Sequence, residues 1–305
     1  MLSMRYFILM VIDFVVLWYL TMTAIDILYS HRAATSNYGS TQMWSFLSEN
    51  VLDTDLLFLG SSRAMYHLSP AVMDSVLGTH SYNLGMPGAD MSDVWARYML
   101  YRQKHGTVPY VIINVDYFSL AKSLGVELYQ FYPWFHNHLF RKYVFKKRHF
   151  PIVDRFVPMA RFRGSRWQYL IKAPKTLKQG FSGFDKRMDM DKINHAELCF
   201  TIEPEIESAF CDLLDMIKAD GAKVLLLDSP MYKEALVRMS NPGQMREYYE
   251  NVAKARGILF LDYSDMSGIS CDSSLFADRL HLNSAGAAAF SDSLANAIKK
   301  MNWIL

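Results

Sequence analysis

FLGSSRAMYHLSP, residues 58–70, is the stretch that decides how this chain folds. The apolar residues 56–59 lead into Gly60, and two adjacent serines, Ser61 and Ser62, follow at once. A short apolar run that ends at a glycine and continues into an amphipathic pattern is typical of a buried strand, a turn and a helix. A serine in such a turn either caps the helix or presents a nucleophile at its N-terminus, and both interpretations are open at this point.

The same pattern recurs along the chain. Short apolar runs alternate with stretches of helical periodicity, which favours a parallel sheet covered by helices on both faces. We therefore expect a flavodoxin-like α/β fold, a three-layer sandwich with a five-stranded parallel sheet, whose sites lie beyond the carboxyl ends of the strands. The predicted strands are 55–59, 81–84, 111–115, 224–227 and 258–261, and the predicted helices are 69–77, 90–104, 203–219, 244–255 and 284–300.

The N-terminus carries a long apolar segment. Residues 7–28 are almost all apolar, with polar interruptions that include Asp13 and Asp26. A helix of this length reaches about 30 Å, enough to cross a bilayer. An acid near the middle of a membrane costs about 2.5–3.5 kcal/mol on insertion scales, so we expect the face that carries Asp13 to contact another membrane protein. We predict an uncleaved transmembrane anchor over 1–30, with a hydrophobic helix packed on a soluble core as the alternative.

Two further segments depart from the strand–helix pattern. Residues 31–52 read as a linker with an entry helix, and 53–305 as the α/β domain. Residues 122–200 fit no strand–helix period, so we predict an insertion after the third strand that forms a lid, a substrate wall or a membrane-facing surface. His136 and His138 lie in its aromatic run FYPWFHNHLF. Aromatic packing or lid contacts are favoured for them over metal binding, because no further ligands can be placed.

Composition narrows the partners only slightly. The 32 lysines and arginines nearly balance the 30 aspartates and glutamates. Basic residues concentrate between 141 and 187, but no nucleic-acid-binding module accompanies them, so nucleic-acid binding is not expected. The three cysteines follow neither a disulfide framework nor a zinc-site spacing. We expect no metal and no cofactor.

A second stretch that could carry chemistry is ADRLHLNSAGAAAF, residues 277–290. Asp278 and His281 are three positions apart, just before the last predicted helix. This spacing lets the carboxylate hold the imidazole tautomer whose other nitrogen faces outward as a base. The loops after the first and last strands open on the same edge of a doubly wound sheet, so Ser62 can meet this pair there. His67, on the first helix, is expected to pack rather than to act as the base.

An acyl-transfer site also needs hydrogen-bond donors for the oxyanion. The segment YNLGMPGAD, residues 82–90, supplies a glycine-bearing turn after the second predicted strand. Gly88 has no side chain, so its N–H can approach an oxyanion closely. The N–H of Ser62 at its helix start is the second candidate donor.

These blocks, in this order, resemble the SGNH/GDSL hydrolases. GSSR at 60–63 resembles their Gly-Asp-Ser-Leu block with Ser62 as nucleophile, and NLGMPG at 83–88 resembles the second block with Gly88 in the oxyanion hole. Residues 278–281 resemble the terminal Asp-x-x-His block that completes a triad of Ser62, Asp278 and His281. The resemblance covers roughly 53–118 and 222–298.

The third block of the family supplies an oxyanion-hole asparagine, and here the chain departs from it. Alignment by strand end places Asp116 at that position. An ionised aspartate only accepts hydrogen bonds, so Asp116 is protonated, or another group donates, or it serves another role such as orienting Arg63. Asn114 becomes the alternative donor if the register shifts by two residues. Arg63 itself is expected to bind substrate.

Membrane-anchored members with a GSSR block resemble the extracytoplasmic partners of membrane-bound O-acyltransferases, such as the teichoic acid D-alanylation protein and the alginate acetylation proteins. The resemblance implies a serine-dependent acyl ester enzyme of the bacterial cell envelope, an O-acyltransferase or esterase. Its acceptor would be a cell-envelope polysaccharide or polymer, and its partner a multi-span O-acyltransferase. A non-catalytic SGNH-fold binding subunit is the alternative that Asp116 suggests. A phosphate-binding protein that uses the GSSR turn as an anion nest leaves Asp278 and His281 unexplained.

Overall fold

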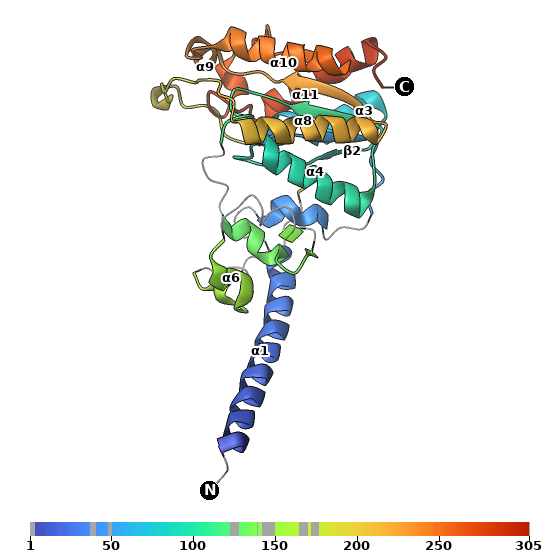
Figure 1. The fold of residues 1–305 in the computed structure, drawn as a ribbon. Coiled ribbons are helices and arrows are strands. Elements are labelled where there is room, and N and C mark those ends of the chain that lie inside the picture. Colours follow the sequence, from blue (N-terminus) through green and yellow to red (C-terminus); the bar gives the residue numbers. More distant parts are fainter. Residues whose placement is uncertain are drawn as a thin grey trace. The chain divides into compact units, whose positions relative to one another are not determined.

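The computed structural model describes residues 4–36, 41–47, 51–122, 128–138, 140–141, 150–164, 170–171 and 177–304 (Figure 1). The chain divides into two compact units. Residues 1–48 and 127–176 form unit 1, and residues 49–126 and 177–305 form unit 2. The insertion predicted over 122–200 is therefore shared between the units, because its later part, from residue 177, belongs to unit 2.

The core of unit 2 is a five-stranded parallel sheet in the order β2-β1-β3-β4-β5. This is the flavodoxin-like arrangement that the alternating apolar runs predict. All four residues of the first strand are fully buried, as expected for a sheet that is covered on both faces. The strands are β1 (Leu56–Leu59), β2 (Ser81–Asn83), β3 (Tyr110–Asn114), β4 (Lys223–Asp228) and β5 (Leu259–Asp262).

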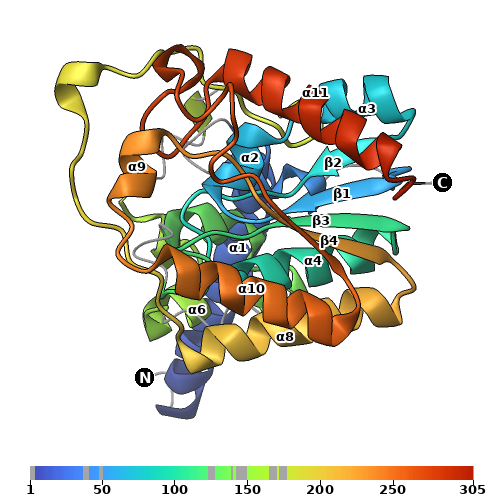
Figure 2. The same cartoon turned by 90° about the horizontal axis from the view of Figure 1, so that it is seen from above.

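Helices cover both faces of this sheet, as Figure 2 shows. One face carries α2 (Ser62–His67), α3 (Pro70–Leu77) and α11 (Ser284–Lys300), and the other carries α4 (Met91–His105), α8 (Pro204–Ala219) and α10 (Pro242–Arg256). The connecting segments contain α9 (Lys233–Val237) and the short 3₁₀ helices η4 (Met190–Lys192) and η5 (Ser273–Leu275).

Local sequence signals set the helix starts in unit 2. The carboxylate of Asp90 accepts the N–H groups of Ser92 and Asp93 at the start of α4, at 2.9 and 3.1 Å. Asn283 caps α11 in the same way, and prolines occupy the first positions of α3, α8 and α10. Both devices satisfy or remove N–H groups that would otherwise lack partners. They place the loops before α4 and α11 at defined positions.

Unit 1 begins with the 31-residue helix α1 (Met4–Ala34). Of the helices in the described part of the chain, it is the one long and apolar enough to cross a membrane. Residues 4–21 are all exposed, and burial begins after them. The helix runs past the predicted anchor end at residue 30, and Ala33 and Ala34 are buried. Part of the predicted linker is therefore the packed end of α1.

Aromatic side chains form much of the interior of unit 1. The ring of Trp44 lies 5.4 Å from the rings of both Phe131 and Phe140, and its indole N–H donates to Gln130 at 3.2 Å. Part of the aromatic run FYPWFHNHLF is thus core rather than lid. Besides α1, the described part of unit 1 contains η1 (Thr41–Leu47), η2 (Leu128–Trp134), α6 (Ile152–Phe156) and η3 (Ala160–Phe162).

Candidate active site

The turn between β1 and α2 places Ser62 as the first residue of α2. Gly60 has φ +140°, and a Cβ there would lie 2.7 Å from the carbonyl oxygen of Asn114, so only glycine fits without displacement. Ser61 is the N-cap, and its Oγ also donates to Asp116 Oδ2 at 3.0 Å. Of the two serines, Ser61 therefore caps the helix, and Ser62 is the candidate nucleophile.

The structure brings Ser62, His281 and Asp278 together. Ser62 Oγ lies 2.8 Å from His281 Nε2, although the two residues are 219 positions apart in the chain. His281 Nδ1 lies 3.0 Å from both carboxylate oxygens of Asp278. Asp278 also accepts the backbone N–H groups of Leu280 and His281, at 2.9 and 3.0 Å. The result is a continuous hydrogen-bonded chain from carboxylate to imidazole to hydroxyl.

The geometry determines which of these three hydrogen-bonded side chains carry protons. Partial burial raises the pKa of Asp278, but the hydrogen bond and charge of His281 and two backbone N–H groups outweigh it, so the net pKa is lowered. An ionised carboxylate only accepts, so Nδ1 of His281 carries the proton. Nε2 then presents its lone pair to the hydroxyl of Ser62, as a general base requires.

Gly88 lies in the turn after β2, half-buried, with φ +74°. This turn is fastened to the nucleophile turn by the backbone, since Met86 N–H donates to the carbonyl of Gly60 at 3.1 Å. The amide of Asn83 donates to the carbonyl groups of Ala64 within α2 and of Leu68 at its C-cap, at 2.8 Å each. The two glycine-bearing turns of the resemblance therefore lie side by side.

Asp116, at the position of the third predicted oxyanion donor, is engaged as an acceptor in the interior. Asp116 is 2% exposed and accepts hydrogen bonds from Ser61 Oγ, Phe118 N–H and Ser119 Oγ, at 3.0, 2.8 and 3.1 Å. A carboxylate engaged as an acceptor does not serve an oxyanion. Asn114, the alternative donor, is fully buried in β3, where its amide donates to the carbonyl of Leu227 at 2.9 Å. Asp116 and Asn114 are therefore both engaged in the interior, which disfavours either side chain as the oxyanion donor.

The prediction that Arg63 binds substrate is also wrong. Its side chain is 3% exposed and pairs with Asp228 at 3.0 Å, while Asp116 lies 3.9 Å away. It also donates to the carbonyl oxygen of Ser229. Arg63 extends from α2 into the interior, where its guanidinium compensates the charge of two carboxylates. These are Asp228 at the end of β4 and Asp116 just after β3. The suggestion that Asp116 orients Arg63 agrees with this geometry.

Asp228 is the second acid of this buried cluster. Burial raises the pKa of Asp228 to about 7, although the charge of Arg63 opposes the effect. Neighbouring Asp262 and Asp116 raise it further. Arg63, the residue that follows the candidate nucleophile Ser62, thus pairs with two buried carboxylates.

His67 packs in the interior, as predicted, but it also makes specific hydrogen bonds. Its Nε2 accepts the backbone N–H of Leu282 at 3.0 Å, so the proton resides on Nδ1 and is donated to Ser229 Oγ at 2.8 Å. Burial, together with the charges of Arg63 and His281, lowers the pKa of His67 well below its ordinary value. His67 is a neutral bridge from α2 to the loop that carries His281.

Two aromatic side chains that the sequence did not single out flank His281. The rings of Tyr66 and Phe184 lie 5.6 and 6.0 Å from the imidazole and 4.2 Å from each other. Phe184 is held because its carbonyl accepts the N–H of Ser284 at 2.8 Å. Burial and the charge of Asp278 raise the pKa of Tyr66, so its phenol stays neutral. Together the rings form an apolar wall beside the base.

No family model and no curated protein matches the chain. Among solved structures, it is similar to a putative lipolytic protein of the G-D-S-L family from Desulfitobacterium hafniense DCB-2, with 12% identity and a TM-score of 0.42, over 81% of this chain and 99% of that one. It is also similar to a putative acylhydrolase from Bacteroides fragilis NCTC 9343, with 14% identity and a TM-score of 0.45, over 86% and 95% of the two chains. A GDSL-like lipase from Bacteroides thetaiotaomicron VPI-5482 shares 12% identity and a TM-score of 0.44, over 85% and 95%.

Proposed function

We propose that this chain is a serine-dependent acyl ester enzyme that works through an acyl group carried on Ser62. The observation that carries the proposal is the hydrogen-bonded chain from Asp278 through His281 to Ser62, with distances of 3.0 and 2.8 Å. A serine hydroxyl is a weak nucleophile unless an adjacent base takes its proton, and the base works best when a third group orients it. Ser62 as nucleophile, His281 as base and Asp278 as orienting group meet these requirements, and they come from two loops that are distant in the sequence.

In the first half of the reaction, Ser62 Oγ attacks the carbonyl carbon of an ester, and its proton passes to Nε2 of His281. The ionised Asp278 stabilises the imidazolium that forms. When the tetrahedral intermediate collapses, the bond to the leaving alkoxide breaks, and His281 returns the proton to that oxygen. The products are an alcohol and the acyl-Ser62 ester.

Backbone N–H groups stabilise the oxyanion in this scheme. Ser62 is the first residue of α2, and within the described part of the chain its N–H has no hydrogen-bond partner. The resemblance assigns the second donor to Gly88, in the adjacent turn. Asp116 and Asn114 are engaged elsewhere, so neither supplies the side-chain donor that the resemblance leads one to expect. Loss of one such donor costs about 10²–10³ in rate, so we expect a slow enzyme.

In the second half, His281 takes a proton from an incoming hydroxyl, whose oxygen attacks the acyl-Ser62 carbonyl. The bond between the acyl carbon and Ser62 Oγ then breaks, and His281 returns the proton to Ser62 Oγ. Water as the acceptor gives hydrolysis, and a sugar or polymer hydroxyl gives transfer. We propose transfer to a hydroxyl of a cell-envelope polysaccharide or polymer, with the catalytic unit on the extracytoplasmic side. The membrane-length helix α1 and the resemblance of the GSSR block support this assignment.

The proposed partner is a multi-span O-acyltransferase that delivers the acyl group. Asp13 supports a partner within the membrane because it lies in the exposed stretch of α1. An acid there is costly against lipid and cheap against a polar group of another protein. Affinity purification of the full chain from its native membrane tests this, with Asp13→Leu as the variant expected to lose the partner.

Labelling with a fluorophosphonate probe tests the chemistry. The wild-type chain is expected to label, while Ser62→Ala and His281→Ala abolish labelling. Ser293→Ala changes a partly buried serine on α11 that lies outside the triad; it is the control and should label normally. Normal labelling in Ser62→Ala would overturn the triad, and an unlabelled wild-type chain would favour the non-catalytic binding subunit. Mass analysis after incubation with an activated acyl ester, with and without polymer, then separates transfer from hydrolysis.

A further inference from the structure

The short helix α6 of unit 1 carries a cluster of apolar side chains that are open to solvent. Ile152, Val153 and Phe156 are 74%, 52% and 68% exposed, and their spacing along a helix puts them on one side of it. The acidic residue of α6, Asp154, is buried and pairs with Arg163. The exposed positions of α6 are therefore entirely apolar. Large apolar side chains that gather in this way mark a surface that contacts another molecule or a membrane.

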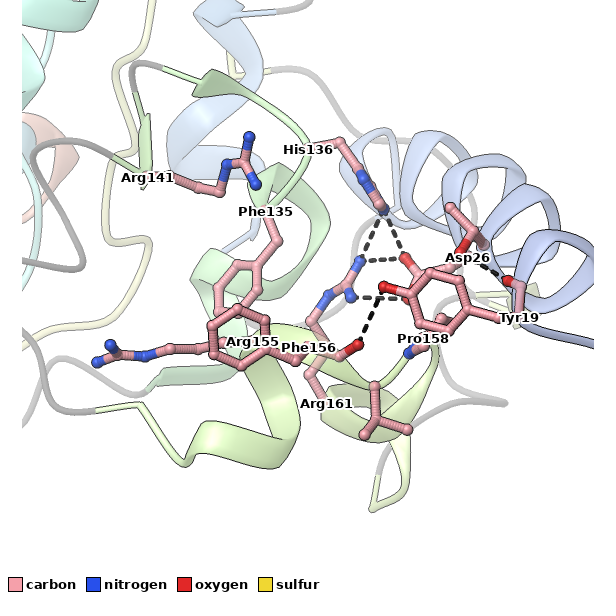
Figure 3. Close-up of a pocket in the computed structure, with 11 residues that line it drawn as sticks. Tyr19, Asp26, Phe135, His136, Arg141, Arg155, Phe156, Pro158 and Arg161 are labelled. Carbon is pink, nitrogen blue, oxygen red and sulfur yellow. Dashed lines mark hydrogen bonds and ion pairs between the residues drawn. The ribbon is translucent and has the colours of Figure 1, made fainter. Parts of the chain in front are cut away.

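Hydrogen bonds fix the end of α6 to the long helix α1. The phenol of Tyr19 donates to the carbonyl oxygen of Phe156 at 3.3 Å (Figure 3). Three residues farther along, the backbone N–H of Met159 donates to Asp26 Oδ2 at 2.5 Å. The segment that leaves α6 therefore follows α1 for about two helical turns, and the end of α6 lies beside Tyr19.

A buried ion pair makes this attachment firm. Asp26 is 1% exposed, and both of its carboxylate oxygens receive the guanidinium of Arg161, with Nη1 2.7 Å from Oδ2. His136 Nε2 lies 2.7 Å from Asp26 Oδ1, and Figure 3 shows the three side chains pointing toward one another at the wall of a cavity of about 220 Å³. This contact corrects the expectation that His136 serves aromatic packing or a lid. Separating a buried pair leaves an uncompensated charge, so the segment around Arg161 stays on α1.

The attachment sets the level of α6 along α1. The exposed residues 4–21 span about 27 Å at the helical rise of 1.5 Å per residue, close to the thickness of about 30 Å of a hydrocarbon core. Trp18 and Tyr19 lie near the end of this stretch, and such rings are enriched at the membrane–water interface. Because Tyr19 holds the end of α6, the apolar side of α6 lies at the level of this interface.

We infer that α6 is a second membrane contact, which lies in the interface of the bilayer beside the membrane-length stretch of α1. Ile152, Val153 and Phe156 insert between the lipids, as apolar side chains of interfacial helices do. Lipid is the occupant because the apolar surface continues the exposed stretch of α1 at the level where that stretch ends. By itself the surface is also far smaller than the area of about 800 Å² that each partner buries in a specific protein complex.

The inference rests on the proposed membrane anchoring of α1, and it does not depend on the chemistry at Ser62. A single membrane helix leaves the part of the chain outside the bilayer free to rotate about the axis of that helix. A second contact at α6 removes this freedom for unit 1. It assigns to unit 1 the role of fixing its own orientation on the membrane.

Photocrosslinking of the full chain in its native membrane tests this. The photoreactive residue p-benzoylphenylalanine is placed at one position at a time, and the adducts formed on irradiation are identified by mass spectrometry. Phe156 is the test position, and Leu9, which is 54% exposed on α1, is the positive control. Lipid adducts are expected at both positions.

Ile171 is the matched control within unit 1. It is apolar and 77% exposed, but its neighbour Leu170 accepts a hydrogen bond from Arg32 at 3.3 Å. Arg32 lies about 20 Å beyond Tyr19 along α1. Interfacial helices lie within about 5–10 Å of the boundary between headgroups and acyl chains, so lipid adducts should be at least about tenfold more abundant at Phe156 than at Ile171.

Three outcomes overturn the inference. An adduct with another protein at Phe156 assigns the surface to a protein partner. Lipid adducts that are absent at Phe156, or no more abundant there than at Ile171, show that α6 does not enter the lipid. Absence of lipid adducts at Leu9 removes α1 from the bilayer, and the proposed anchor fails together with the inference. Val153 is the second test position and must agree with Phe156, and thermal unfolding establishes that each variant is folded.

Discussion

The Nε2 atom of His67 lies 3.0 Å from the backbone N–H of Leu282, the residue that directly follows His281. A fully buried imidazole on the nucleophile helix therefore sets the position of the loop that carries the candidate base. Its other nitrogen is bonded to Ser229, at the end of β4. The helix α2 and two loops of the site are joined through this one side chain.

We predict that His67→Leu slows acylation of Ser62 by about 10- to 100-fold, because a displacement of about 1 Å can cost this much in rate. The fluorophosphonate labelling rate measures the effect. His67→Asn or His67→Gln, which keep a donor and an acceptor, should recover part of it. The pH at which labelling is half-maximal should not move, since His67 does not exchange the proton. A shift of that pH in His67→Leu would assign His67 a role in proton transfer instead.

Asp278→Asn is expected to lower the labelling rate by about 10² to 10⁴, with Ser62 and His281 intact. The amide no longer stabilises an imidazolium, and it can donate to Nδ1 and so favour the wrong tautomer. The folded state should survive, because the Asp278 side chain is 45% exposed. Pre-steady-state release of the leaving group from an activated ester gives the rate. A loss below threefold would show that Asp278 does not orient His281.

The buried acid Asp228 predicts a dependence of stability on pH. Its pKa is raised to about 7 in the folded state, so the native chain holds a proton that the unfolded chain releases near pH 4. This stabilisation is complete below about pH 4 and disappears as the pH rises through about 7. The free energy of unfolding should fall by at most about 1.4 kcal/mol per pH unit in this window.

Urea unfolding of the full chain in detergent at several pH values measures this slope. Asp228→Asn should flatten it between pH 4 and 7, since the asparagine carries no proton equilibrium. Asp265→Asn, at an exposed position, is the control and should leave the slope unchanged. An identical slope in Asp228→Asn would place the titrating group elsewhere.

Gly60→Ala should damage the nucleophile turn. Gly60 has φ +140°, and a Cβ would lie 2.7 Å from Asn114 O and 2.9 Å from Ala64 Cβ, so β1 and α2 must separate. We expect a loss of about 1–3 kcal/mol in stability together with a lower labelling rate. Gly243→Ala is the matched control, because nothing lies within 4 Å of a Cβ there. Equal midpoints and labelling rates for both variants would contradict the strain argument.

The sheet could be predicted because each strand corresponds to a short apolar run in the sequence. Leu56–Leu59 is an apolar run that coincides with β1, and the apolar run 224–227 lies within β4, which extends by one residue at each end. The meeting of Ser62 with His281 follows from topology, since the first and last loops of a parallel sheet share one edge. The positions of side chains that depend only on the fold class could therefore be predicted from the sequence.

The hydrogen-bond and ion-pair partners of Arg63, Asp116 and His67 were not within reach. Arg63 and His67 meet Asp228, Ser229 and Leu282, which lie more than 160 positions from them along the chain, and Asp116 meets Ser61 from 55 positions away. Each pairing depends on which strand end the side chain meets. Phe184 was equally hidden, because it lies in a segment without strand or helix periodicity. Asp26 looked like an interruption of an apolar helix, and only the fold of unit 1 shows Arg161 beside it.

The helix α1 runs without a break from Met4 to Ala34, and its buried end forms part of unit 1. A helix without a break behaves as a rigid rod, so its exposed and packed ends move together. Under the proposed membrane anchoring, any tilt or rotation of residues 4–21 in the bilayer therefore turns the ion pair of Asp26 and Arg161 by the same angle. No flexible joint separates the proposed membrane segment from the buried end of α1.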